Sequence, residues 1–267
     1  MSSATARPDL IDQILRRDRL VVAGGLAFLA ALAWGYIIHI HMSRTMSPVM
    51  PAGMAMPMAA EPDGPQLLWL VPMWVVMMVA MMIPSAAPMI LLFAGVARQR
   101  RIRNVPSASA AVFTLGYLLV WALYATIAAV AQWELHRLAL LSPAMAAASP
   151  LLAGGLLLLA GIYQWLPLKG ACLSHCRSPL GFFTDHWREG RWGALLIGVE
   201  HGTYCVGCCW ALMALLFVVG MMNLLWVVLI AAFVLVEKLL ARGRLFWRIS
   251  GGMLIACGLW MIVTGLG

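Results

Sequence analysis

The sequence predicts an all-α protein, a polytopic transmembrane helical bundle of about seven spans with the N-terminus inside and the C-terminus outside. Composition is the first reason: 63% of the 267 residues are hydrophobic and only 10% are charged, whereas about a quarter of a soluble domain is charged. The second reason is that apolar residues form runs long enough to cross a bilayer as helices. The third is that basic clusters alternate with these runs, as the positive-inside rule requires.

The order of the runs gives the expected topology. The first run is too long for the core of a signal peptide, and no small-residue cleavage site follows it, so we interpret it as a retained helix. Of the 18 Lys and Arg residues, only Arg44 and Arg137 fall on the outer side in this layout. The spans are expected at residues 20–40, 67–97, 108–131, 151–168, 193–219, 224–240 and 251–266.

This topology also divides the chain. Residues 1–19 form a cytoplasmic segment, residues 20–41 the first transmembrane helix, and residues 42–66 an extracytoplasmic loop rich in Met and Pro. Residues 67–267 form a six-helix membrane domain that is expected to bind metal. The net charge of +8 follows from the inner loops, so nucleic acid is not an expected partner. The expected location is the cytoplasmic membrane of a bacterium, with the lipid bilayer as a partner.

The fifth expected span contains the motif around which a site is predicted, EHGTYCVGCCW at residues 200–210. At 100° per residue, His201, Cys205 and Cys208 fall within an arc of about 60°, and Cys209 lies at its edge. Sulfur ligands beside an imidazole suit Cu(I), with Zn(II) or an iron–sulfur centre as alternatives. The other interpretation is that these cysteines pack as small apolar residues.

The second expected span carries a methionine cluster at a similar depth. Met77, Met78, Met81 and Met82 lie close together on its helix, and their thioethers are soft ligands. Met also fills gaps in apolar packing, so a structural role is the alternative. Counted along the two helices, the methionines and the cysteines reach similar levels near the middle of the bilayer.

Further candidate ligands lie near the two membrane surfaces. Cys172 and Cys176 are four residues apart in the second inner loop, so they share a helix face, and thiols confined to the inner half indicate a reduced site rather than disulfides. Cys257 is alone and is interpreted as packing. Lys238 can snorkel to the membrane surface, whereas Glu237 must face protein or water. A path for protons or cations is one interpretation of this region, and simple anchoring at the interface is the other. The secondary candidates are Glu200, Glu237, His39, His41, Met42 and Met46.

The outer loop indicates metal collection. It begins at His39 and His41 and continues through Met42 and Met46 into Met- and Pro-rich sequence that cannot fold alone. Exposed thioethers bind Cu(I) without losing a proton, so a copper-collecting arm is the preferred interpretation. A plain flexible linker is the alternative.

Together these motifs resemble a family of bacterial integral membrane proteins that is described as predicted metal-binding. The similar segments are MMVAMMIPS at residues 77–85, residues 169–179, CVGCCW at residues 205–210, and NLLW at residues 223–226 with Glu237 and Lys238. The resemblance covers about residues 67–267 and implies metal binding without implying a reaction.

Three functions agree with these observations. The preferred one is an inner-membrane protein that captures, stores or transfers Cu(I) through Met, Cys and His ligands, with a periplasmic metal donor or a membrane partner. The second is a copper-dependent membrane oxidoreductase or oxygenase component, and the third is a thiol redox protein that uses Cys205 and Cys208. Whether the protein is an enzyme stays open, and so do zinc and iron. The chain carries no G-x-x-x-x-G-K-[ST] loop for ATP.

The predicted topology has a direct test. A reporter fused after Gly267 should show periplasmic activity, because an odd number of spans carries the C-terminus across the membrane from a cytoplasmic N-terminus. A fusion at the basic cluster after the second span, near residue 101, should show cytoplasmic activity. Cytoplasmic activity of the C-terminal fusion would remove one span from the layout.

Overall fold

The structure is a computed structural model that describes residues 8–45, 64–102, 108–142, 146–220, 223–239 and 244–265. The described residues form ten α-helices and one isolated β-bridge, between Leu141 and Ala147, so the predicted all-α class is confirmed. The helices are α1 (Pro8–Thr45), α2 (Gly64–Ile102), α3 (Ala110–Arg137), α4 (Pro150–Trp165), α5 (Pro167–Arg177), α6 (Pro179–His186), α7 (Gly190–Ala214), α8 (Leu216–Val219), α9 (Leu224–Leu239) and α10 (Arg244–Gly265).

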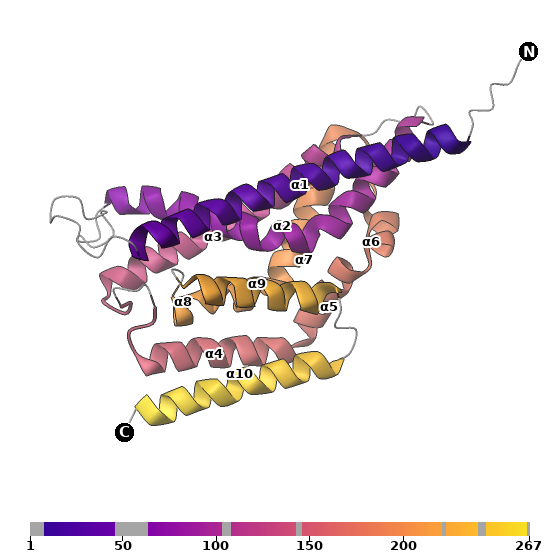
Figure 1. Cartoon of the computed structure of the whole chain (residues 1–267). Coiled ribbons are helices and arrows are strands. Elements are labelled where there is room, and N and C mark those ends of the chain that lie inside the picture. Colours follow the sequence, from indigo (N-terminus) through magenta and orange to yellow (C-terminus); the bar gives the residue numbers. More distant parts are fainter. Residues whose placement is uncertain are drawn as a thin grey trace, which may run out of the picture.

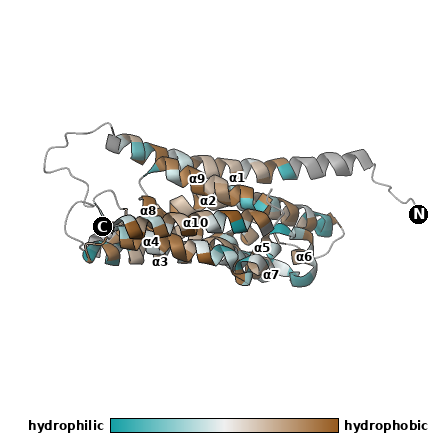
Figure 2. Ribbon diagram, turned by 90° about the horizontal axis from the view of Figure 1, so that it is seen from below, coloured by the Kyte–Doolittle hydropathy of each residue, from teal (hydrophilic) through white to brown (hydrophobic). Residues whose placement is uncertain are grey.

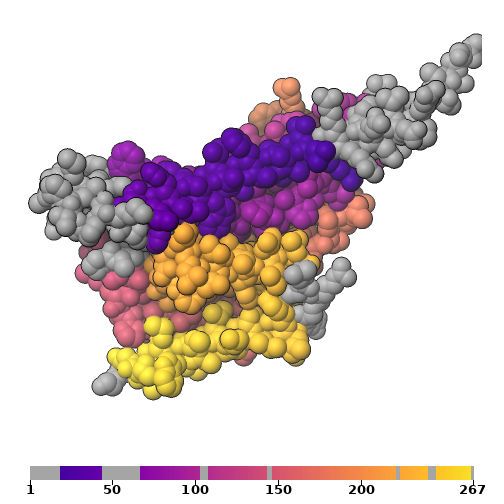
Figure 3. All heavy atoms as spheres, viewed as in Figure 1, coloured from indigo at the N-terminus to yellow at the C-terminus, as the bar shows by residue number. Residues whose placement is uncertain are grey.

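The long helices lie side by side in one bundle (Figure 1). Helix α1 packs along α2, α2 packs on α3, α3 packs on α7, and α4 pairs with α10. The start of α1 and the end of α10 lie at opposite ends of the bundle (Figure 1). In the space-filling view, α1, α9 and α10 cover much of one face (Figure 3). Hydrophobic residues run along the helices, and many hydrophilic ones lie near their ends (Figure 2).

Five helical segments in the described part of the chain are long and apolar enough to cross a membrane: Arg19–Ser43, Leu67–Ile102, Ala110–Arg137, Gly190–Val219 and Leu245–Gly265. The pair α4 and α5 counts as a sixth if it is one span, although it bends by 67°. Helix α9 has 16 residues, about 24 Å at 1.5 Å per residue, against a hydrocarbon core of about 30 Å. Seven spans therefore remain a prediction that depends on α9.

The fourth expected span, residues 151–168, ends earlier than predicted. Helix α4 stops at Trp165, and Leu166 adopts an extended backbone with φ −67° and ψ 138°. Pro167 explains the break, because it has no N–H to continue the ladder and it disfavours helical geometry in the residue before it. The chain restarts at Pro167 as α5, which packs against α7.

The prolines of α2 do not break that helix, and one of them gives α1 its docking point. Pro84 lies inside α2, and its missing N–H leaves the carbonyl of Ala80, four residues earlier, without a helical partner. The indole Nε1 of Trp34 on α1 donates to this carbonyl at 3.0 Å. A polar group freed in an apolar interior is thus satisfied by the neighbouring helix.

Glycines set the two closest helix contacts. A Cβ on Gly198 of α7 would lie 2.1 Å from the carbonyl oxygen of Phe113 on α3. In the second pair, Cβ atoms on Gly154 and Gly161 of α4 would lie 2.7 and 2.8 Å from the carbonyl oxygens of Gly258 and Gly251 of α10. Helices approach this closely only where side chains are absent.

The α4–α10 contact yields a stability prediction with a matched control in the same helix. We expect Gly154→Leu to destabilise the protein by about 1–3 kcal/mol, because the new side chain meets α10 backbone and Ile262. Gly155→Leu should be tolerated, because nothing lies within 4 Å of the added Cβ and the position is exposed. Thermal unfolding of both variants in one detergent measures the difference. Equal midpoints would mean that α4 and α10 are not packed through these glycines.

Candidate metal centre

Four thiols meet between α5 and α7. Cys205, Cys208 and Cys209 of α7 are each at most 1% exposed. The Sγ atoms of Cys208 and Cys209 are 3.2 Å apart, and the Cys208 thiol also donates to the carbonyl of Cys205 at 3.1 Å. From α5, Cys176 brings its Sγ to 4.0 Å from that of Cys208. The cluster exists because the break at Pro167 turns α5 onto α7.

Cys172 lies one turn before Cys176 on the same helix and also faces α7. A Cβ on Gly207 would lie 2.8 Å from its Sγ, so Gly207 is the residue that admits this thiol. The Tyr163 hydroxyl donates to the carbonyl of Gly207 and ties α4 to the same point. Cys172 is half-buried and free. Cys257, which the sequence analysis assigned to packing, is instead exposed on α10, so that prediction was wrong.

Lys238 lies inside the bundle, which corrects the expectation that it snorkels to the membrane surface. It is 7% exposed, and its Nζ lies 2.9 Å from the Sγ of Cys205 and 3.1 Å from the Oγ of Ser85. The hydrogen bonds to these two partners, on α7 and α2, replace the hydration that the ammonium would have at the membrane surface. Lys238 thus places a positive charge directly beside a thiol, where it stabilises negative charge on sulfur.

Tyr117 of α3 connects the cysteines to the methionine-rich helix. Its hydroxyl lies 3.1 Å from the Sγ of Cys205 and 3.4 Å from the carbonyl oxygen of Met82. Cys205 and Met82 are therefore at one level of the bundle, as their positions along the helices indicated. Met77, Met78, Met81 and Met82 are all buried, at 3% exposure or less. Their role as ligands remains a prediction.

His201 lies beside this cluster with one unpaired ring nitrogen. It is 3% exposed, its ring stacks on those of Phe113 and Tyr117, and its Nδ1 is buried and unpaired in the described part of the structure. A buried imidazole nitrogen without a partner is uncommon, and neutral imidazole is a metal ligand. His201 therefore keeps the ligand capacity that the sequence suggested.

A cavity of about 120 Å³ opens next to His201. Its wall includes one thioether, one thiol, one imidazole and one ammonium, from Met89, Cys176, His201 and Lys238, together with the hydroxyl-bearing Ser85. Met89 and Lys238 were not among the predicted site residues. Met89 continues the face of Met78 and Met82, and a lysine within an apolar span is itself a functional signal.

Glu237 faces protein, as expected of a carboxylate in a span. Lys169 Nζ lies 2.7 and 2.9 Å from its two carboxylate oxygens, and both side chains are 1% exposed. Gln164 accepts from the same ammonium, and Arg177 donates to the Glu237 carbonyl. Lys169, which follows directly after the fourth expected span, is therefore part of a buried ion pair. Consecutive residues of α9 thus serve two different clusters.

The other secondary candidates lie outside the thiol cluster. Glu200 is 3.3 Å from His186 Nε2 and 3.8 Å from Arg188, so it takes part in a separate polar group. His39 and Met42 are exposed and His41 is half-buried near the end of α1, and none of the three lines the cavity. Met46 lies outside the described residues.

Within the described residues, no three His, Cys, Asp or Glu side chains form a group ready to hold a metal ion. The thiols are close, yet hydrogen bonds to each other, to Lys238 and to Tyr117 orient them. Methionine thioethers also bind soft metals, but they are not among these four residue types. A metal bound here would have to exchange these hydrogen bonds for coordination.

The fold and these contacts define a class: a helical protein with membrane-length apolar segments and a buried thiol cluster under a methionine-rich helix. The chain belongs to the family described as PpoB2, copper chaperone, whose model matches residues 71–261. That range holds all the cysteines and the methionines of α2, and leaves α1 outside. No curated protein and no solved structure matches the chain. The family confirms the copper-related part of the predicted function.

The buried ion pair generates a prediction. We expect Glu237→Gln to destabilise the protein by about 3–5 kcal/mol, because it leaves the Lys169 charge buried without a carboxylate. The control is Glu134→Gln, which breaks a half-exposed pair with Arg137 and should cost at most about 1 kcal/mol. The double variant Lys169→Met/Glu237→Leu should regain much of the loss, since no charge is then buried. Denaturation in detergent provides the measurement, and equal losses for both Gln variants would contradict the assignment.

Proposed function

We propose that this protein is an integral membrane protein that holds and transfers Cu(I) on the thiol cluster between α5 and α7. The observation that carries the proposal is the convergence of Cys176, Cys205, Cys208 and Cys209, from two helices, beside Lys238. Copper is the cargo, and the family description supports that choice of metal.

The chemistry of the cluster favours Cu(I) over harder ions. Thiolates, thioethers and imidazole are soft or borderline ligands, while hard divalent cations prefer carboxylates and carbonyl oxygens. The carboxylate of Glu237 is held by Lys169, and that of Glu200 pairs with His186 and Arg188. Cys205 and Cys208 are the proposed central ligands. The other ligands complete the coordination of the ion or pass it to this pair; they are Cys209, Cys172, Cys176, His201 and the methionines of α2.

Lys238 gives the site its charge balance. Two thiolates and one Cu(I) carry a net charge of −1, which is costly in a medium of low dielectric constant. The ammonium of Lys238, 2.9 Å from Cys205 Sγ, neutralises that charge. Its presence supports a site for a monovalent cation bound by two thiolates.

The proposed route runs from the outer side inward. His39, His41, Met42 and Met46 collect copper outside, the thioethers Met77, Met78, Met81 and Met82 lie between, and the cysteines hold it more tightly. Each step goes to a ligand set with higher affinity for Cu(I), since thiolates bind it more strongly than thioethers. The orientation follows the predicted topology, with the basic ends of the helices in the cytoplasm.

One further observation favours a second function, thiol redox chemistry. The Sγ atoms of Cys208 and Cys209 are 3.2 Å apart, and those of Cys176 and Cys208 are 4.0 Å apart. Cys208 thus has one neighbouring thiol on α7 and another on α5. A redox protein would change its thiol count with no metal bound, whereas a copper carrier would bind the metal stoichiometrically.

The copper proposal predicts a graded loss of metal. Cys205→Ser and Cys208→Ser each replace a soft ligand with a hard hydroxyl at nearly constant volume, so each should lose most of the bound Cu(I). Cys257→Ser, which changes an exposed thiol on α10, should keep the wild-type content. Copper per protein is measured by elemental analysis after anaerobic loading with Cu(I) and removal of excess metal. If all three variants keep the wild-type content, the thiol cluster is not the copper site.

A further inference from the structure

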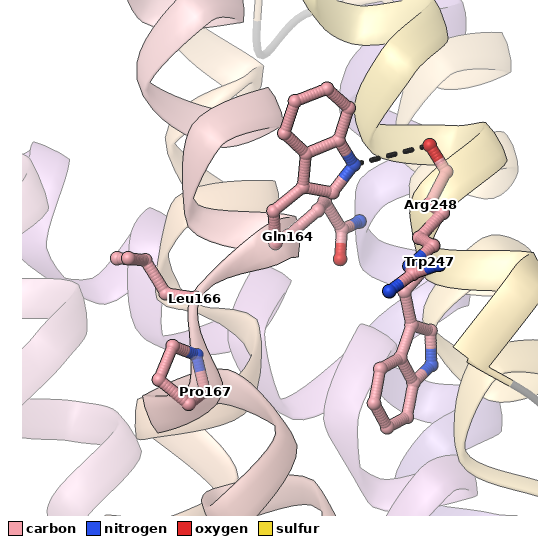
Figure 4. A pocket seen from close by; sticks show the side chains of 6 residues that line it. Gln164, Leu166, Pro167, Trp247 and Arg248 are labelled. Carbon is pink, nitrogen blue, oxygen red and sulfur yellow. Dashed lines mark hydrogen bonds between the residues drawn. The ribbon is translucent and has the colours of Figure 1, made fainter.

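A second, larger cavity lies where α4 breaks into α5 and meets the start of α10. It has a volume of about 570 Å³ and is lined by Gln164, Trp165, Leu166, Pro167, Trp247 and Arg248. The cavity arises from the 67° bend at Pro167. After the close contact between Gly161 and Gly251, the bend turns α5 away from α10. Figure 4 shows the Gln164 amide directed into the space between α4 and α10, on the side of Trp247 and Arg248. Nothing in the copper proposal uses this space.

The unpaired polar atoms of its lining side chains are all donors. Gln164 is 2% exposed, its Oε1 accepts from Lys169, and its Nε2 is buried without a partner. Trp247 Nε1 is likewise buried and unpaired in the described residues. Arg248 adds an exposed guanidinium, while its backbone carbonyl is occupied by Trp165 Nε1 at 3.1 Å. Buried donors without acceptors are costly, so a ligand that fits here brings acceptor oxygens and negative charge.

The surroundings of the cavity are those of a membrane surface. Trp165 is 55% exposed, and on α10 Leu245 and Ile249 are 69% and 54% exposed. The break between α4 and α5 and the start of α10, which line the cavity, lie at the end of the bundle that also holds α6 (Figure 1). Exposed apolar side chains beside an arginine and two tryptophans are typical of the zone where lipid head groups meet acyl chains.

We propose that this cavity binds the phosphate group of an anionic phospholipid, whose acyl chains lie along Trp165, Leu245 and Ile249. Arg248 supplies the positive charge. Gln164 Nε2 and Trp247 Nε1 supply hydrogen-bond donors that the phosphate oxygens accept. The close contact of Gly161 with Gly251 fixes the two walls. The Gln164 that forms one wall also holds Lys169, the partner of Glu237, so the lipid site adjoins the buried ion pair.

The test uses the full chain in detergent and native mass spectrometry, with phosphatidylglycerol and phosphatidylcholine of identical acyl chains as probes. We expect tighter binding of phosphatidylglycerol. Arg248→Gln should weaken it about tenfold, because one charge-assisted contact to phosphate is lost; the Trp165 bond survives, since it uses the backbone. Trp247→Phe keeps an aromatic ring without the N–H and should weaken binding by a smaller factor. The matched control is Arg191→Gln, which removes an exposed charge from the start of α7.

Each result decides the proposal. Selective loss in Arg248→Gln and Trp247→Phe, with Arg191→Gln unchanged, supports it. Equal binding of the two lipids, or equal effects of the two Arg variants, overturns it. A large excess of inorganic phosphate should not displace phosphatidylglycerol; if it does, and binds alone with similar strength, the site takes a free anion rather than a lipid. No copper is present in this assay, so the result of the lipid-binding test does not depend on whether the copper proposal holds.

Discussion

The requirement that buried charges and backbone polar groups find partners inside an apolar bundle governs this structure. Lys238 is the clearest case, because an ammonium cannot stay in hydrocarbon without compensation. Its bonds to Ser85 and Cys205 bring α9, α2 and α7 to one point, and Tyr117 adds α3 through the same sulfur. The position of the thiol cluster is therefore fixed by polar contacts as much as by apolar packing.

The same requirement explains how breaks in helices become sites. At Pro167 the chain loses its helical ladder and turns, and the turned segment is the one that carries Cys172 and Cys176 to α7. Glycines allow the approach, with Gly207 admitting Cys172 and Gly198 seating α7 on α3. Proline and glycine, which weaken a helix in isolation, here determine which side chains meet.

Local sequence patterns predicted what depends on a single helix, and little of what depends on contacts between helices. The all-α class follows from the apolar runs, and the shared face of Cys205 and Cys208 follows from helical periodicity. The contact of Cys176 with Cys208 depends on the direction that the chain takes after Pro167, which periodicity does not give. Lys238 was misassigned because snorkelling depends only on distance to water, whereas its true position depends on partners from two other helices. The copper ligands, the spans and the orientation remain predictions.

The bond between Trp34 and Ala80 has a consequence for where the folding unit begins. The family match starts at residue 71, yet the carbonyl that Pro84 releases in α2 is satisfied from α1. A chain cut back to the matched range would lose the donor for that oxygen, which lies in the helix that also carries the methionines. The first helix thus supplies a hydrogen bond that the second helix needs, and a truncation at the matched boundary would remove it.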